Sequence, residues 1–363
     1  MKTRFMAAGL TAAVALGALT GCATQQPENG AEAPEQTFTM RLTTFSGDNV
    51  PGAIANERWA ELVEERSDGR LKVDFFYAGS LLSAQDTLAG VGDGRADAGW
   101  IAAPYYPADL PLSQVAGVPF VTSNPGAQTA AFADLYESND AFRAEWDANN
   151  VTVLHFQPAT EMVLGMRAPL DSIDDLQGVS IRSVGYASDA LLAIGANPVA
   201  IGAADLYDSI ERGVVEGYAG FAFDAITGFG LENIAPYTVS SGLGNYILLA
   251  TVVNNDWWAA LPDDLKQVVK EVDAEFNALS LDVLVEANAG YCDIMVAAGA
   301  EMSVLPDAEQ ERWRAAVGDS ISEKFLATAG SAASSFWDEY LASLRSYESQ
   351  YEPLSGVAAC MSR

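Results

Sequence analysis

The residue type best placed to do chemistry in this sequence is an arginine at the end of an apolar strand. Arg182 closes the segment 176–182 in a chain that holds 19 basic and 49 acidic residues. The carboxyl ends of strands in open α/β sheets face a ligand crevice. A guanidinium there can grip a carboxylate through two parallel hydrogen bonds. A structural salt bridge to one of the many acids is the alternative.

Signatures of catalysis are scarce beside this arginine. The one histidine, His155, lies in the apolar string 153–156, and a hydrogen-bonded place in the core is the expected role. The sequence has no G-x-S-x-G elbow, no Walker A loop and no G-x-G-x-x-G after a strand. It also lacks a C-x-x-C pair or a His–Cys cluster. We expect no enzyme, no cofactor and no metal; a secreted α/β enzyme is the weaker alternative.

The N-terminus predicts export. Lys2 and Arg4 precede an uncharged apolar run at residues 7–19, which is short for a membrane span and typical of a signal peptide. Residues 19–22, Leu-Thr-Gly-Cys, resemble a bacterial lipobox, which implies that Cys22 is lipidated. We expect residues 1–21 to be a lipoprotein signal and residues 22–37 a flexible tether, with the body at a periplasmic or extracytoplasmic membrane face. A plain cleaved signal is the alternative.

Charge and cysteine content limit the partners and the compartment. A formal net charge of −30 would repel a phosphate backbone, so nucleic acid is not expected as a partner. Cys292 and Cys360 remain once Cys22 is acylated. In an oxidising compartment two such cysteines usually pair, so we predict a disulfide, with two separate buried thiols as the alternative.

Alternating strand and helix patterns predict an α/β fold. Strands are expected at 37–43, 71–76, 96–102, 151–156, 163–167, 179–183 and 198–200, with helices at 54–65, 84–93, 186–194 and 203–212. This order favours βαβ units and a mainly parallel sheet. An apolar stripe from Leu265 to about residue 298 predicts one helix of roughly 45 Å. Two shorter helices are the alternative. A final helix is expected after a small-residue break at 330–335.

Ordered short motifs over about residues 38–313 resemble the solute receptors of tripartite ATP-independent periplasmic (TRAP) transporters. The matching segments, in chain order, are Gly-Arg-Leu-Lys-Val at 69–73, Ala-Gly-Ser-Leu at 78–81, Gly-Arg-Ala-Asp at 94–97, Asp-Leu-Gln-Gly at 175–178, Ile-Arg at 181–182, Gly-Ala-Asn-Pro at 195–198, Asp-Leu-Tyr at 205–207, Gly-Val-Val-Glu-Gly at 213–217 and Leu-Pro-Asp-Asp-Leu at 261–265. Each motif alone is weak, but their order makes chance agreement improbable.

The resemblance implies a two-lobed periplasmic-binding-protein fold that closes on a small organic acid, with a long helix spanning both lobes. Arg182 would pair with the solute carboxylate, and a small and a large membrane subunit would be the partners. Lobe I would comprise residues 38–155, completed by about 245–300. Lobe II would comprise residues 156–244, completed by about 301–330. Residues 331–363 would form a C-terminal helix and tail. A receptor serving a signalling partner is the alternative.

Two departures from the family pattern bear on the solute. Many members carry a second arginine about six residues before the position of Arg167, where this chain has Glu161 nearby. Many also carry asparagine where this chain has Gly220, beside Phe221. A monocarboxylate with an apolar or aromatic body is therefore expected. A zwitterion held by Arg182 and Glu161 is the alternative.

The remaining predicted site residues are mostly aromatic. Arg167 is expected to orient the site or to reach the solute through water, or else to form a salt bridge with Asp171 or Asp174. The candidate wall residues are Phe45, Trp100, Tyr105, Tyr218, Phe221, Phe223 and Tyr246.

Overall fold

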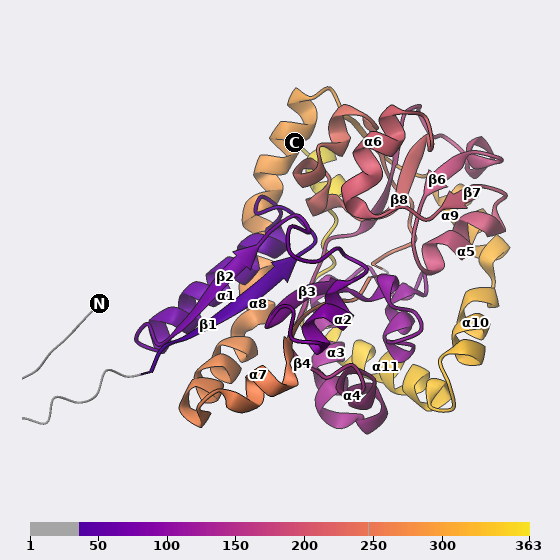
Figure 1. Ribbon diagram of the computed structural model, residues 1–363. Coiled ribbons are helices and arrows are strands. Elements are labelled where there is room, and N and C mark those ends of the chain that lie inside the picture. Colours follow the sequence, from indigo (N-terminus) through magenta and orange to yellow (C-terminus); the bar gives the residue numbers. More distant parts are fainter. Residues whose placement is uncertain (1–35, 246) are drawn as a thin grey trace, which may run out of the picture. The chain divides into compact units, whose positions relative to one another are not determined.

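The computed structural model describes residues 36–245 and 247–363. The predicted signal, Cys22 and nearly all of the predicted tether lie outside the described residues, as does Tyr246. Eleven strands form two sheets in the part described (Figure 1). Their bounds are β1 Phe38–Thr44, β2 Leu71–Phe76, β3 Ala98–Ala102, β4 Val151–Gln157, β5 Met162–Met166, β6 Ser180–Arg182, β7 Asn197–Val199, β8 Gly217–Ala222, β9 Tyr237–Ser240, β10 Leu249–Asn254 and β11 Glu301–Val304.

Both sheets are mixed but mainly parallel, as expected, because in each of them a single strand runs against the others. The first has the order β2-β1-β3-β10-β4 and the second β11-β9-β5-β8-β6-β7. In the first sheet, β10 is antiparallel to both of its neighbours, β3 and β4. In the second, β5 is antiparallel to β8 and β9. The chain builds most of the second sheet before β10 returns to the middle of the first, and a returning strand need not run with its neighbours.

Helices surround the two sheets. The α-helices are α1 Pro51–Arg66, α2 Thr87–Gly92, α3 Pro125–Ser138, α4 Asp140–Asp147, α5 Tyr186–Ala193, α6 Leu206–Glu211, α7 Asn255–Ala260, α8 Asp263–Ala297, α9 Asp307–Val317, α10 Ser320–Thr328, α11 Ala333–Tyr347 and α12 Gly356–Met361. The 3-10 helices are η1 Ala103–Tyr105, η2 Leu112–Gly117, η3 Ile173–Leu176, η4 Ala203–Asp205, η5 Phe223–Ala225, η6 Thr227–Phe229 and η7 Leu231–Asn233. Of the helices described, none is long and apolar enough to cross a membrane.

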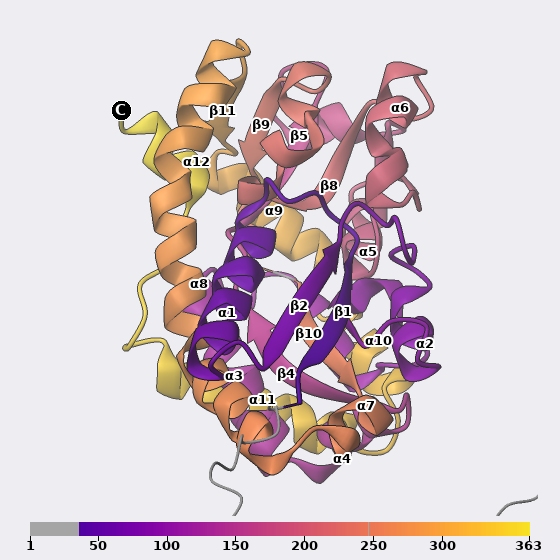
Figure 2. The ribbon, with the colours of Figure 1, turned by 60° about the vertical axis from the view of Figure 1, so that its left-hand side comes forward.

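The long helix predicted from the apolar stripe is confirmed as α8, which has 35 residues. Its buried positions include Leu265, Val269, Val272 and Phe276 at three- and four-residue steps. The helix packs on α1 and β4 and also on η5 and α12. Figure 2 shows α8 running past the elements of both sheets. One rigid element therefore supports both sheets, as the two-lobed fold requires.

His155 belongs to a buried hydrogen-bond network in the first sheet. Its Nδ1 lies 2.9 Å from Asp273 Oδ1 on α8, and its Nε2 lies 3.1 Å from Asn56 Oδ1 on α1. Trp59 Nε1 also donates to Asp273 Oδ1. Burial raises the pKa of Asp273, while its hydrogen bonds and the nearby His155 act in the opposite direction. The network joins β4, α1 and α8, which is a structural role.

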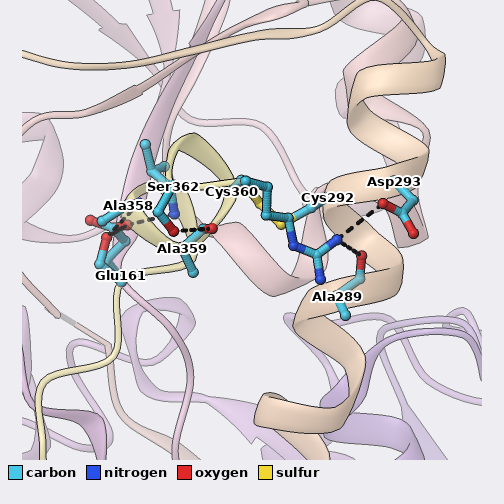
Figure 3. Close-up of a disulfide and its surroundings, with 11 residues drawn as sticks. Glu161, Ala289, Cys292, Asp293, Ala358, Ala359, Cys360 and Ser362 are labelled. Atoms are coloured by element: carbon cyan, nitrogen blue, oxygen red, sulfur yellow. Dashed lines mark hydrogen bonds and ion pairs between the residues drawn. A yellow bond between two sulfur atoms is a disulfide. The ribbon is translucent and has the colours of Figure 1, made fainter.

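The C-terminal helix α12 is attached on two sides. Cys360 forms a disulfide with Cys292 of α8, with Cα atoms 5.3 Å apart, as the cysteine count predicts (Figure 3). The Glu161 carboxylate accepts hydrogen bonds from Ser355 Oγ and, at 3.1 Å, from Val357 N. Gly356 sits so close to Phe223 that a Cβ at this position would lie 2.1 Å from the ring. Covalent, polar and steric contacts therefore fix the end of the chain.

We predict that removing the disulfide destabilises the fold without changing it. The bond closes a loop between residues 68 apart, which restricts the unfolded chain. Replacing both cysteines, C292S with C360S, should lower the free energy of unfolding by about 2–4 kcal/mol. Urea denaturation followed by circular dichroism measures this. Reduced wild-type protein is the control and should match the double variant. Equal stability of the double variant and the oxidised wild type would contradict the prediction.

Candidate functional site

A cavity lies where the carboxyl ends of strands from both sheets approach one another. The space between its lining atoms is about 690 Å³, part of it open to solvent. Its walls come from the ends of β1, β3, β6 and β8, the start of β5, and the 3-10 helices η1 and η5. The lining is mostly apolar, with Arg182 and Asp224 as its charged side chains.

Arg182 is the buried cation of this cavity. It ends β6, and the residue is 2% exposed. Its Nε donates to Ile201 O at 2.9 Å, and its Nη2 donates to Tyr105 Oη at 3.2 Å. Tyr105 follows the end of β3 in the first sheet, whereas β6 belongs to the second sheet. The guanidinium therefore joins the two sides of the cavity.

Aromatic rings form the walls beside Arg182. Phe45 stacks on Trp100 with ring centroids 4.7 Å apart, and it meets Tyr105 edge-on at 6.5 Å. On the other side, the Arg182 guanidinium lies 5.0 Å from the centre of the Phe221 ring. Phe229 packs against Phe221 at 5.1 Å. A cation beside several aromatic faces suits a ligand that has one anionic group and a flat apolar body.

Two glycines shape the cavity. Gly52 lies in the first turn of α1, and a Cβ there would be 2.4 Å from the Trp100 ring. Gly220 has a φ of +74°, which favours glycine, and it sits where the pairing of β8 with β5 shifts register. The bulge places Gly220, Phe221 and Ala222 on the cavity wall together.

Asp224 is the acid of the cavity and was missed in the sequence. It lies in η5, two residues after the end of β8, and the residue is 7% exposed. Its Oδ1 accepts hydrogen bonds from Thr160 N at 2.9 Å and from Thr160 Oγ1. Burial raises the pKa of Asp224, and these hydrogen bonds oppose the rise. The strand-end argument that selected Arg182 applies equally to this residue, because it follows a strand of the same sheet.

The structure brings five of the predicted binding residues together. Those that line the cavity are Phe45, Trp100, Tyr105, Arg182 and Phe221. The wall also contains residues that we did not predict, among them Asp224, Gly52 and Phe229. Gly52 and Phe229 gave no signal in the sequence, since single glycine and phenylalanine residues have many roles.

Four predicted residues lie away from the cavity lining: Glu161, Phe223, Tyr218 and Arg167. Glu161 accepts hydrogen bonds from Ser240, Ser355 and Val357, which are away from the cavity lining. Phe223 packs against Gly356. Tyr218 is buried in the core of the second sheet, where burial raises its pKa.

Arg167 faces the exposed surface, with Nη1 3.9 Å from Glu216 Oε2. A salt-bridge role was the alternative expected for Arg167, but its acid partner is Glu216 and not Asp171 or Asp174. Asp174 pairs with Arg312 instead.

A cavity between two sheets, walled by strand ends from both and supported by one long helix, defines a two-lobed solute-binding protein. The model of the bacterial extracellular solute-binding proteins of family 7 matches residues 43–328. The chain belongs to this family, whose relatives include the solute-binding proteins of TRAP transporters.

Curated relatives and solved structures agree with this assignment. A Comamonas testosteroni protein named as an outer membrane transporter protein is 28% identical over 60% of this chain, which spans 64% of that relative, just under two thirds. A monocarboxylate 2-oxoacid-binding periplasmic protein of Nostoc is 24% identical over 83% of both chains.

A TRAP solute-binding protein of Rhodoferax ferrireducens in complex with benzoate has a TM-score of 0.79 at 18% identity, covering 86% of this chain and 99% of that one. A Bordetella bronchiseptica protein with bound mandelate has a TM-score of 0.74 at 21% identity, covering 86% and 100%.

We predict opposite effects of the same substitution at two helical glycines. Gly52→Ala should lower the free energy of unfolding by about 1–3 kcal/mol, because the new methyl group displaces Trp100. Gly290→Ala, on an exposed turn of α8 with no atom within 4 Å of the new Cβ, should raise it by about 0.4–1 kcal/mol. Urea denaturation compares the two. Equal stabilisation by both variants would show that Trp100 does not constrain Gly52.

Proposed function

We propose that this protein is the extracytoplasmic receptor of a TRAP transporter and that it captures a small monocarboxylate with an apolar or aromatic body. The observation that carries the proposal is Arg182, a buried guanidinium in a cavity with otherwise mostly apolar walls. Such a cation favours one anionic group, and a charge-assisted hydrogen bond contributes about 1.5–3 kcal/mol.

The shape of the cavity supports a flat body for this solute. The stacked rings of Phe45 and Trp100 line one side, and Phe221 with Phe229 lines another. Gly220 leaves the wall without a side-chain amide for a second carboxylate. Some relatives support this solute class, since the Nostoc protein is described as binding monocarboxylate 2-oxoacids and two solved neighbours hold benzoate or mandelate. Others are described with C4-dicarboxylates or sugar acids.

Closure of two lobes is the proposed capture step. Arg182 comes from the second sheet and its partner Tyr105 from the first, so a solute between them would touch both lobes. We assign the lobes by their sheets, with residues 38–155 and about 245–300 in lobe I, and residues 156–244 and about 301–330 in lobe II. Bound solute would favour the closed form because its carboxylate adds a charge-assisted hydrogen bond to the buried guanidinium.

The delivery step is proposed from family membership. A small and a large membrane subunit would receive the solute at the outer face of the membrane. Lipidation of Cys22 would keep the receptor at that face through its tether. The protein would act as a carrier and not as an enzyme.

We predict that Arg182→Ala weakens binding of monocarboxylates by at least tenfold. The substitution removes the charged partner of the carboxylate, and tenfold corresponds to about 1.4 kcal/mol. Isothermal titration calorimetry with benzoate, mandelate and a 2-oxo acid, preceded by a thermal-shift screen, provides the affinities.

Two further arginines serve as comparisons. Arg212→Ala removes the same charge from an exposed position in lobe II. The affinity of this variant should stay within about twofold of the wild-type affinity. Arg167→Ala tests the expectation of a role in the site and should behave like Arg212→Ala. If Arg182→Ala binds as tightly as wild type, Arg182 does not hold the carboxylate.

A further inference from the structure

We propose that Asp224 is a second recognition group of the cavity, which accepts a hydrogen bond from a hydroxyl or ammonium group of the solute. The inference rests on the proposed function, because it assumes that Arg182 holds the solute carboxylate. It narrows the solute class to carboxylates that also carry a hydrogen-bond donor.

The position of Asp224 is fixed by a neighbouring segment. Thr160 lies between β4 and β5, and its amide and hydroxyl both donate to Asp224 Oδ1. Asp224 N donates in return to Thr160 Oγ1 at 3.0 Å. These three bonds lock the rotamer of the carboxyl group, so its second oxygen has a defined direction. A locked polar group is what a specific contact to a small ligand requires.

The second oxygen, Oδ2, is the group available to a solute. Within residues 36–245 and 247–363, no hydrogen bond to Oδ2 is formed, although Asp224 is 7% exposed and lines the cavity. Oδ2 is not one of the fully enclosed side-chain atoms that lack a partner, so solvent in the cavity reaches it. A solute that displaces this solvent without offering a donor leaves the oxygen desolvated, which costs free energy, whereas a solute with a donor avoids that cost. The Tyr291 hydroxyl donates to Asn49 O at 3.4 Å and not to Asp224 Oδ2. Burial and the nearby Asp224 raise the pKa of Tyr291.

Arg182 and Asp224 together would discriminate between carboxylates with and without a hydrogen-bond donor. A carboxylate without a donor would place its anion beside Arg182 but would leave Asp224 Oδ2 desolvated. On a solute that also has a hydroxyl or ammonium group, the carboxylate would bind Arg182 and this second group would donate to Asp224 Oδ2. Sites built to bond a polar group reject analogues that lack it far more strongly than apolar pockets reject a missing methylene. Asp224 would therefore act as a specificity-determining residue.

Calorimetry on wild-type protein with matched acids tests this directly. Benzoate is compared with 2-, 3- and 4-hydroxybenzoate and with 3-(aminomethyl)benzoate, and phenylacetate with mandelate and 3-hydroxyphenylacetate. We expect at least one donor-bearing acid to bind ten or more times more tightly than its unsubstituted partner. A preference for the ammonium compound identifies a zwitterionic solute, and a preference for a hydroxyl compound identifies a hydroxy acid. If no acid in the panel shows such a preference, the proposal is wrong.

Asp224→Asn then assigns the preference to this residue. The asparagine oxygen can still accept from Thr160, but its amide would present a donor to the cavity. The preferred acid should lose at least tenfold in affinity, while its unsubstituted partner changes by less than threefold. The matched control is Glu232→Gln, which neutralises a buried carboxyl of the same half that does not line the cavity. Retention of the preference in Asp224→Asn would overturn the assignment.

Different outcomes would contradict the proposed function and the role of Asp224. If Arg182→Ala weakens every acid but no donor preference exists, the proposed function stands and the role of Asp224 does not. If no carboxylate binds to wild type, the proposed function itself fails. Should Asp224→Asn not fold, the wild-type panel still decides whether a donor is recognised.

Discussion

The cavity is built around one guanidinium that is buried between the two sheets. Removing an arginine from water is unfavourable unless its N–H groups find acceptors. Arg182 meets this need partly with Ile201 O from its own half and Tyr105 Oη from the other. Both of these oxygens are neutral, and hydrogen bonds to an ionised acceptor are about twice as strong. A carboxylate in the cavity would supply such an acceptor, so the same side chain that joins the two halves also favours an anionic solute.

A single connecting segment links the cavity to the C-terminal attachment. Pro158 and Ala159 line the cavity, Thr160 holds Asp224, and Glu161 holds Ser355 and Val357. Neighbouring residues of this segment, which joins β4 to β5, therefore serve different parts of the molecule. The disulfide of Cys360 with Cys292 then ties the same C-terminal helix to α8. The segment between β4 and β5 therefore both attaches the C-terminal helix and positions Asp224.

The periodic parts of the fold could be predicted from the sequence, and the long-range parts could not. The stripe that begins at Leu265 specified α8 because a helix buries every third or fourth residue whichever elements surround it. The strand β10 reads as six buried residues without alternation, a pattern that a strand and a buried helix share. Its insertion between β3 and β4 depends on segments roughly a hundred or more residues away in the sequence.

In the site, too, some residues could be predicted from the sequence and others could not. Arg182 was found from its place at a strand end, and Asp224 could have been found by the same rule. Tyr218 and Phe221 were both expected on the wall. Across the bulge at Gly220, Phe221 lines the cavity, whereas Tyr218 is buried in the core of the second sheet. A one-residue register shift of this kind changes which side chains face a ligand and leaves little trace in the sequence. Glu161 likewise seemed free to bind solute, because its partners lie 79 and about 195 residues further along the chain.

A chain with a net charge of −30 can still bind an anion because distance and screening separate its surface from its cavity. At about 0.1 M salt, exposed charges more than roughly 10 Å apart interact weakly in water. The charges that line the cavity lie closer to a bound solute than the surface charges do, so they dominate the field that the solute meets. In the proposed site Arg182 would attract a carboxylate, and Asp224 would oppose it unless the solute brings a donor. Solute selectivity would then rest on two side chains in the cavity, while the surface acids bear on solubility.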